Sequence, residues 1–345
     1  MVCKRCEERI KKNKIDSDFL DLFKGNKISY PHEIKEQLRQ GADVNHEDAY
    51  GRTALMFASM KGKYDAVETL IGNNADIDHV DYKKCTALMY ACKNAQITIV
   101  KLLVGKGANI NHIDDKQNTC LMYACKNEEK KMVQVLIDNG ADVNLAGDEI
   151  FTPLMHACMR DDEEIVQMLV KNHANVNIDN ALLAACLTIK PENAKILIKA
   201  GADVNFVLKE DGDEDSILLC VTKALVRSGR RRYMSIIELL IDHKANVNDV
   251  DADNESALMV SAKHGDEELV QLLVRAGANV DAVNSKGESA LMAAAKNGKE
   301  NIVLLLVRAG ADVAIKDHKG NSWHSTTHDY SAVKKLLTEM GEKKR

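Results

Sequence analysis

Several cysteine and histidine residues of this chain have spacings that occur in metal sites. Cys3 and Cys6 form a C-x-x-C pair, and His46, His79 and His112 recur every 33 residues. A structural zinc ion needs four ligands, and no second C-x-x-C or spaced His pair follows nearby. Side chains on neighbouring packed helices lie about 8 to 10 Å apart, whereas zinc holds nitrogen ligands at about 2 Å. We therefore expect no metal site and no cofactor.

The other cysteines do not indicate catalysis. Four of them, Cys92, Cys125, Cys158 and Cys186, occupy a recurring small-residue position inside apolar phrases, which favours packing. A reactive thiol needs an exposed, electropositive setting. The sequence also contains no glycine-rich phosphate loop and no nucleophile motif. We expect no catalytic residue, so the protein is predicted not to be an enzyme.

Composition limits the classes of partner. Hydrophobic residues make up 45% of the chain, charged residues 29% and aromatic residues only 4%, so the core must be aliphatic. The net charge of -5 argues against nucleic acid and against anionic membranes, which usually require a basic surface. No apolar run approaches the roughly 18 residues of a membrane span, so we expect no membrane insertion. Nine cysteines with no sign of a disulfide framework favour a reducing compartment, the cytoplasm or alternatively the nucleus.

Two phrases repeat along the chain and define its elements. "GADVN" or a near copy begins at Gly41, Asn74, Gly107, Gly140, His173, Gly201, Lys244, Gly277 and Gly310. Between these copies stands a phrase such as "TALMYAC", in which Thr or Ser precedes an apolar run and is expected to cap a short helix. A second amphipathic helix follows and ends at the "GADVN" glycine, where a left-handed residue is expected. Each unit is therefore a pair of helices, joined to the next unit by a polar finger.

This pattern resembles the ankyrin repeat over roughly residues 16–341, with "TPLMHAC" at 152–158 and "GADVN" as the closest matches. The resemblance implies an all-α, ankyrin-type solenoid of about ten helix-turn-helix repeats with β-hairpin-like fingers and capping end repeats. The usual family histidine is replaced here by methionine, for example Met89 and Met122, so thioether packing should replace a polar contact. A single repeat cannot bury its own apolar faces, so its neighbours must stabilise it.

The spacing of the repeats suggests five segments. They are a charged N-terminal tail (1–15), regular repeats 1–5 (16–177), irregular repeats 6–7 (178–248), repeats 8–10 with a C-terminal cap (249–341) and a short tail (342–345).

Repeats 6 and 7 depart from the regular length. The finger of repeat 6 is almost absent, whereas repeat 7 gains three residues in its finger and seven that we place between its helices, around "RSGRRRY". Loop charges often serve only to keep a loop in water, and the alternative is a docking or hinge element. The charged residues concerned are Asp211, Asp213 and Glu214 in the finger and Arg230, Arg231 and Arg232 in the link.

The first helices should present one face to a partner. The residue after each Leu-Met pair, together with those three and four positions later, shares a face. Proteins resembling this one usually bind partners on this concave helix face and on the finger tips. Tyr and Arg are favoured in interfaces, but repeated tyrosines can equally cover neighbouring helices, and lysine near a helix end can simply complement the dipole. The predicted strip comprises Phe57, Met60, Lys61, Tyr90, Lys93, Asn94, Tyr123, Lys126, Asn127, His156, Met159 and Arg160.

We therefore predict a non-catalytic scaffold or adaptor, a monomer, that binds an acidic and apolar segment of another protein. The alternative is a stoichiometric inhibitor or regulator of a partner enzyme, including a secreted effector of a host-associated microbe.

Overall fold

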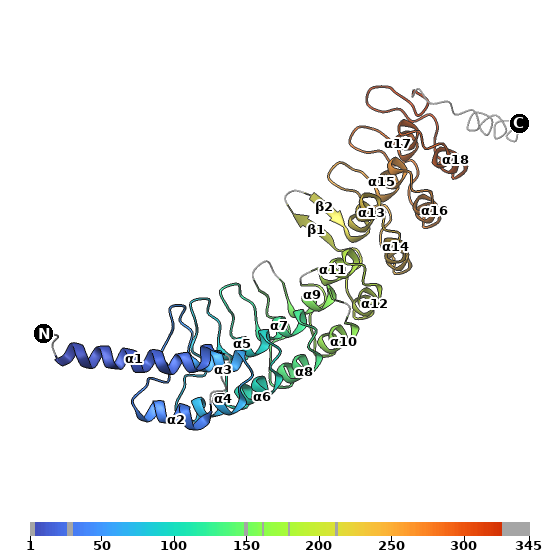
Figure 1. The fold of residues 1–345 in the computed structure, drawn as a ribbon. Helices are drawn as coiled ribbons and strands as arrows, with labels where there is room; N and C mark the ends of the chain where they lie inside the picture. The colour runs from blue at the N-terminus through green and yellow to red at the C-terminus, as the bar shows by residue number, and fades with distance from the viewer. Residues whose placement is uncertain are drawn as a thin grey trace, which may run out of the picture. The chain divides into compact units, whose positions relative to one another are not determined.

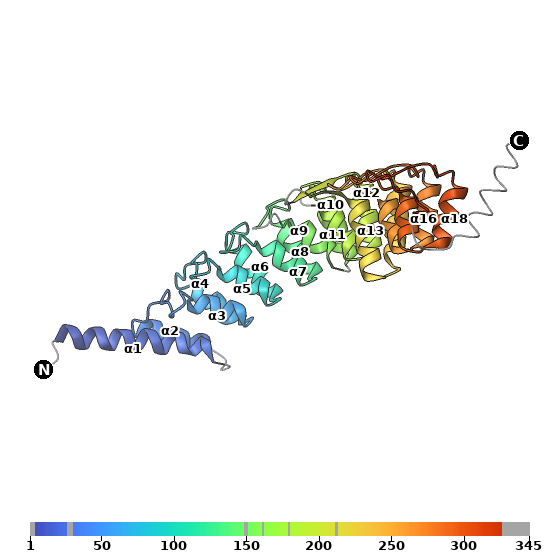
Figure 2. The ribbon, with the colours of Figure 1, turned by 90° about the horizontal axis from the view of Figure 1, so that it is seen from above.

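The computed structural model describes residues 4–25, 30–147, 151–160, 162–178, 180–210 and 213–325. The chain divides into two compact units, residues 1–179 (unit 1) and 180–345 (unit 2). Within each unit, helix pairs follow one another in chain order (Figures 1 and 2). We call the first helix of a pair inner, the second outer, and the segment leading to the next inner helix a finger.

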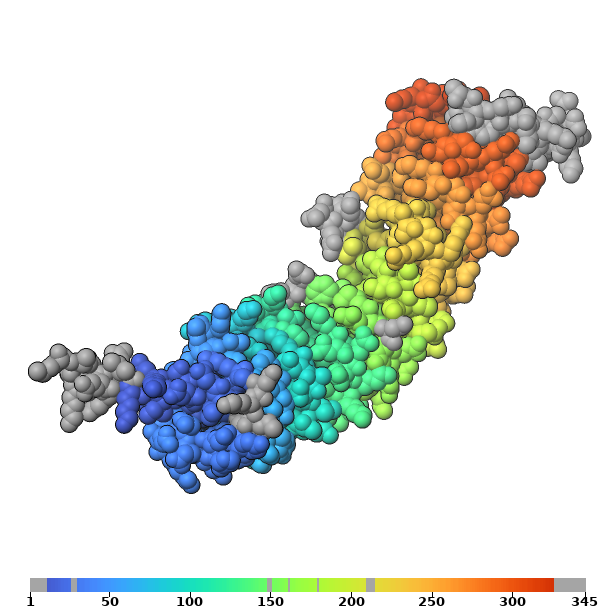
Figure 3. All heavy atoms as spheres, in the orientation of Figure 1, coloured from blue at the N-terminus to red at the C-terminus, as the bar shows by residue number. Residues whose placement is uncertain are grey.

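Unit 1 contains five helix pairs within the described residues. The inner helices α3, α5, α7 and α9 form one row and the outer helices α4, α6, α8 and α10 another, and the fingers project from the inner row (Figure 1). The space-filling view shows the successive repeats of this unit as adjoining bands (Figure 3). The helices are α1 (Lys4–Lys24), α2 (Pro31–Arg39), α3 (Ala54–Met60), α4 (Tyr64–Ile71), α5 (Ala87–Lys93), α6 (Ile97–Gly105), α7 (Cys120–Lys126), α8 (Lys130–Asp138), α9 (Pro153–Cys158) and α10 (Glu163–Lys171).

Unit 2 contains four helix pairs and one hairpin within its described residues. The hairpin is the finger of repeat 7, in which Val207 pairs with Ser216 and Glu210 with Asp213 in antiparallel register. The elements are α11 (Ala181–Leu187), α12 (Pro191–Lys199), β1 (Val207–Glu210), β2 (Asp213–Ser216), α13 (Ile217–Ser228), α14 (Tyr233–Asp242), α15 (Ala257–His264), α16 (Glu267–Arg275), α17 (Ala290–Lys296) and α18 (Glu300–Arg308). Together, the stacked pairs confirm the predicted all-α solenoid.

The helix boundaries follow from local chemistry. The Thr86 and Thr119 hydroxyls accept hydrogen bonds from the main-chain N–H groups of Met89 and Met122, at 3.3 and 3.2 Å. These bonds satisfy donors that a helix start leaves free. At the other end of each pair, all nine positions predicted to be left-handed have positive φ, including the non-glycine Asn74, at 65°. Both sequence predictions are therefore confirmed.

Asparagine and aspartate side chains join neighbouring repeats at the base of the fingers. The Asn111 side-chain oxygen accepts from the main-chain N–H of Asp142 at 2.8 Å, 31 residues later, while its amide donates to the carbonyl of Gly140 at 3.2 Å. Asn248 makes the same two contacts, with Asn279 and Gly277. A side chain that makes two hydrogen bonds to the next repeat fixes the distance between the two repeats. The asparagine at the end of "GADVN" therefore stabilises the stack of repeats as well as the turn.

The interior consists of thin aliphatic layers. Leu88, Met89 and Cys92 are fully buried in α5, and the equivalent residues of α7 are equally buried. The buried thiols are those of Cys85, Cys92, Cys120, Cys125, Cys158 and Cys186. In α7 the Met122 sulfur also accepts from the Thr119 N–H at 3.5 Å, so methionine takes part in the helix start as well as in the core.

The structure differs from the sequence-based segments at the N-terminus and in repeat 7. Residues 4–15, which we separated as a tail, belong to α1, whose Phe19 and Phe23 are buried. In repeat 7 the added residues mainly lengthen α13 through Ser228, because no helix-breaking residue occurs before Gly229, and only residues 229–232 link the two helices. Placing all seven between the helices was wrong. The predicted C-terminal cap lies largely outside the described residues.

Candidate protein interface

The four rings predicted to face outward from unit 1 occupy equivalent positions on α3, α5, α7 and α9. Tyr90, Tyr123 and His156 are partly exposed, but Phe57 is only 5% exposed. The guanidinium of Arg52 lies 4.7 Å from the centroid of the Phe57 ring and helps to cover it. The expectation of an exposed ring at Phe57 is therefore wrong, because the residue before the helix cap reaches over it.

Lys61 has a structural contact that the sequence did not reveal. Its ammonium group donates to the main-chain carbonyls of Lys24, at 2.7 Å, and Gly25. These carbonyls lie at the C-terminal end of α1, where they have no partner in the helix. Lys61 thus caps the C-terminal end of α1, and its ammonium group is therefore less available to a partner.

Tyr90 is held by an acid in its own finger. Its hydroxyl donates to the Asp81 carboxylate at 2.7 Å, while the other carboxylate oxygen accepts from the N–H groups of Lys83 and Cys85, at 2.9 and 2.8 Å. Asp81 is 5% exposed. Burial, followed by the contact with this carboxylate, raises the pKa of Tyr90, so the hydroxyl remains a donor at neutral pH.

Tyr123 repeats this arrangement with a lysine added from the preceding repeat. Its hydroxyl donates to Asp114, and the Lys93 ammonium lies 3.5 Å from the same carboxylate and 4.4 Å from the centre of the Tyr123 ring. Burial, followed by the bond to Asp114, raises the pKa of Tyr123 to about 12. Burial alone would raise the pKa of Asp114, but the bonds from Tyr123 and Asn118 and the charge of Lys93 lower it overall.

The finger acids of this surface are therefore buried, whereas Lys126 is exposed. The carboxylates of Asp48, Asp81 and Asp114 are buried in the turns that they organise. Lys126 is equivalent to Lys93, but the next finger has Gly147 where Asp114 would correspond, and Lys126 has no ion pair with the described residues. A positive surface with few neutralising groups results.

His156 and its neighbours extend this basic character to α9. The His156 ring stacks on Phe151 at 5.6 Å. Burial first, then the charges of Lys126 and Arg160, lower the pKa of His156, which favours the neutral ring at physiological pH. The remaining predicted residues differ in exposure: Asn94, Asn127 and Arg160 are exposed, and Met60 and Met159 are partly exposed.

The finger tips add two exposed tyrosines that the sequence reasoning missed. Tyr50 and Tyr82 are 65% and 73% exposed. The Tyr82 N–H donates to the carbonyl of Tyr50 at 3.1 Å, which joins the two tips. Gly51 has φ 78°, and a Cβ there would lie 2.7 Å from the Tyr82 ring, so the ring packs directly on this glycine. Tyr50 lies two residues after Asp48 and Tyr82 one residue after Asp81, and this placement in the finger turns was the available signal.

In unit 2 the corresponding lysines are neutralised. Lys223, Lys263 and Lys296 each pair with an acid eight residues earlier, at 2.9, 3.6 and 3.1 Å. These acids are Asp215, Glu255 and Glu288. The equivalent residues of unit 1 are Cys85, 3.0 Å from the Lys93 ammonium, and Asn118. The two units thus present different charge patterns on the same helical positions.

The predicted charged loops of repeat 7 are only partly described. Asp211 lies outside the described residues, and Asp213 and Glu214 belong to β2, with only their backbone described. Arg230, Arg231 and Arg232 are exposed in the link between α13 and α14.

Comparison with known families agrees with this architecture. A family model described as ankyrin repeats (3 copies) matches residues 27–114, 84–147, 121–207 and 225–317. The chain belongs to the ankyrin-repeat family, whose repeats are general protein–protein interaction modules and are typically non-catalytic. None of the curated proteins with which the chain was compared matches it.

Within the described ranges, no helix is both long and apolar enough to cross a bilayer. In the same part of the chain, no three His, Cys, Asp or Glu side chains gather as potential metal ligands. His112 instead contacts the carbonyl of Lys84 at 2.9 Å, and His79 lies 3.3 Å from Glu47.

Proposed function

We propose that unit 1 is a scaffold or adaptor surface that binds an acidic and apolar segment of a partner protein. The observation that carries this proposal is the burial of the Asp81 and Asp114 carboxylates beneath partly exposed tyrosine rings, together with the exposure of Lys126. Lys126 has no ion pair with the described residues, so it can attract a carboxylate without first breaking one.

The tyrosine rings supply the apolar part of the surface. Tyr90 and Tyr123 are held by hydrogen bonds to buried acids, and Tyr82 is held against Gly51. Rings that are already fixed lose little conformational entropy on binding, which improves affinity. Together with Tyr50, they give the surface aromatic anchors of the kind enriched in interfaces.

Lys126 and Tyr82 provide the sharpest test, because both are exposed and neither is needed for the core. We expect the double substitution Lys126→Glu and Tyr82→Ala to weaken partner affinity about tenfold or more. Partners would be isolated by affinity purification, identified by mass spectrometry and then titrated by calorimetry. Lys296→Glu, at the equivalent position of α17, is the matched control and should retain wild-type affinity.

The outcome has two informative parts. Cross-linked partner peptides should be acidic and should contact α5, α7 and the fingers before them. Equal affinity of the double variant and the wild type for every isolated partner would contradict the proposal. If a partner is an enzyme that loses activity at one equivalent of this protein, the role is inhibition and not scaffolding.

A further inference from the structure

Among the described repeats after the first, repeat 7 alone has a lengthened inner helix. Its inner helix α13 has 12 residues, whereas α3, α5, α7, α9, α11, α15 and α17 have six to eight. Gly229, with φ 64°, ends the helix, and its N–H donates to the Leu225 carbonyl at 2.8 Å. The extension carries Arg227 and leads to three further arginines at 230–232, and we call residues 227–232 the arginine loop.

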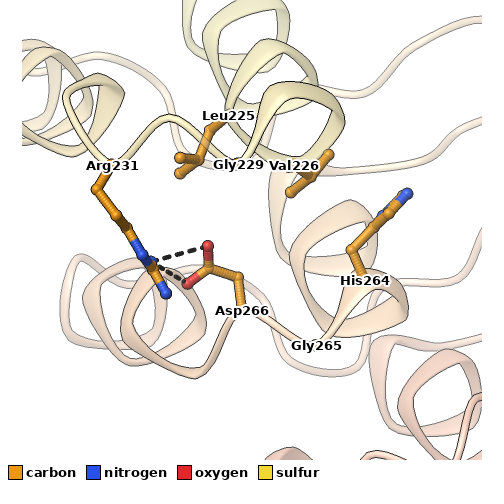
Figure 4. Close-up of a pocket in the computed structure, with 7 residues that line it drawn as sticks. All are labelled: Leu225, Val226, Gly229, Arg231, His264, Gly265 and Asp266. Carbon is orange, nitrogen blue, oxygen red and sulfur yellow. Dashed lines mark hydrogen bonds and ion pairs between the residues drawn. The ribbon is translucent and has the colours of Figure 1, made fainter.

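The arginine loop is fixed by the repeats on both sides of it. The Tyr233 hydroxyl, directly after the loop, donates to the Leu187 carbonyl at the end of α11, at 2.9 Å. On the other side, Arg231 donates to both carboxylate oxygens of Asp266, at 2.9 and 3.0 Å (Figure 4). The same guanidinium group lies 3.4 Å from the Glu268 carboxylate. Asp266 also caps α16 by accepting from the Leu269 N–H at 3.2 Å. A loop whose charges only served solubility would not need these two anchors.

One arginine is thus used as an anchor and three remain. Arg227, Arg230 and Arg232 are exposed and have no ion pair with the described residues. Next to them lies a hollow of about 210 Å³ between the end of α13 and the turn joining α15 to α16. Leu225 and Val226 line the hollow from α13, and His264 lines it from α15 (Figure 4). Leu187, at the other anchor, is an exposed apolar residue.

We propose that the arginine loop and the adjoining hollow dock an acidic segment of a protein partner, with carboxylates on Arg227, Arg230 and Arg232 and an apolar side chain in the hollow. Guanidinium groups can bind carboxylates in a bidentate geometry, and Arg231 already binds the Asp266 carboxylate through one of its nitrogens. This surface belongs to unit 2 and does not depend on the surface proposed in unit 1.

A protein segment fits better here than a nucleic acid. Asp266, Glu267 and Glu268 border the loop, and a continuous phosphate backbone would run past these negative charges. A short peptide can place two or three carboxylates on the arginines and avoid them. Val226, partly exposed at the hollow, also offers an apolar contact that a phosphate backbone would not use.

The test uses the full chain and a fluorescein-labelled peptide of glutamate and leucine, EELEELEE, measured by fluorescence anisotropy. We expect binding to the wild type, and at least a tenfold loss when Arg227, Arg230 and Arg232 are all changed to Glu. The same three residues changed to Lys should give an intermediate affinity, because charge is kept but the fork geometry is lost. Because the three positions are exposed, we expect the variants to remain folded, and thermal melts followed by circular dichroism check this directly.

Lys126→Glu separates this proposal from that for unit 1. Binding that persists in Lys126→Glu and disappears in the triple Glu variant supports the arginine loop. Absence of binding, or binding that only Lys126→Glu removes, overturns it. The proposal is also overturned if a single-stranded RNA or a phosphoserine version of the peptide binds more tightly than EELEELEE. It is overturned as well if the wild type self-associates and the triple Glu variant does not. In each of these cases the occupant of the surface would be of another kind.

Discussion

At the scale of single residues, buried acids determine what unit 1 presents to solvent. Asp81 and Asp114 each accept two main-chain hydrogen bonds within a turn and a third hydrogen bond from a tyrosine hydroxyl. Asn284 makes the same main-chain contacts in unit 2, with Lys286 and Glu288, both at 2.9 Å. An amide is therefore sufficient for the turn, and the charge at Asp114 serves the contacts with Tyr123 and Lys93.

The first prediction concerns the charge of Asp114. Because its folded-state pKa is lowered, its stabilising contribution is complete above the unfolded value of about 4 and is lost as pH falls through the folded value. Asp114→Asn should destabilise the protein by about 1–3 kcal/mol at pH 7. The difference in melting temperature from wild type should shrink as pH falls below about 4.

Melting followed by circular dichroism at pH 7, 4 and 3 measures this difference. Asp317→Asn, in another finger of unit 2, controls for the turn itself, since Asp317 accepts from the N–H groups of Lys319 and Asn321 in the same way and has no ion pair with the described residues. A difference for Asp114→Asn that did not depend on pH would show that the charge has no role.

At the scale of the element, the finger is the unit that couples stability to the proposed interface. Neighbouring finger tips are joined through the main chain in both units, by Tyr82 and Tyr50 in unit 1 and by His318 and Lys286 in unit 2. In each case a left-handed glycine leaves room for the side chain of the next finger, which is Tyr82 over Gly51 and His318 against Gly287. The geometry is shared, and only the side chain that it supports differs.

The second prediction uses these matched glycines. Gly51→Ala and Gly287→Ala should each lower stability by about 1 kcal/mol or more, because alanine is strained at positive φ and its Cβ would clash with the neighbouring ring. Only Gly51→Ala should also weaken partner affinity, since it displaces Tyr82. Chemical denaturation and calorimetry with an isolated partner measure the two effects, and an equal loss of affinity in both variants would argue against a role for Tyr82.

At the scale of the whole molecule, helices of one repeat pack against those of the next, as α5 does against α7 and α15 against α17. Leu121 in α7 and Leu258 in α15 are both 1% exposed and belong to different units. In a stack of this kind, the free energy of unfolding is approximately the sum of the stabilities of single repeats and of the interfaces between neighbours. A substitution that disrupts one layer should therefore destabilise mainly the repeats beside it.

The third prediction follows from this local coupling. Leu121→Ala should cost about 2–5 kcal/mol and accelerate hydrogen exchange mainly in α5 to α9, whereas Leu258→Ala should act mainly in α13 to α17. Hydrogen exchange with mass spectrometry resolves the two patterns. Uniform acceleration over both units in either variant would show that the chain unfolds as one cooperative body.

The sequence by itself determined the helix pairs, their caps and their left-handed ends. These features depend on interactions within a few residues, such as the Thr86 hydroxyl with the Met89 N–H, and on the φ values that Gly41 or Asn74 can adopt. Tertiary structure alone decided which outward-facing side chains remain available to a partner. Phe57 is covered by Arg52, Lys61 caps the C-terminal end of α1, and Lys93 reaches Asp114 of the next repeat. Contacts between repeats depend on the stacking distance and on side-chain reach across it, which a residue's own neighbours in sequence do not specify.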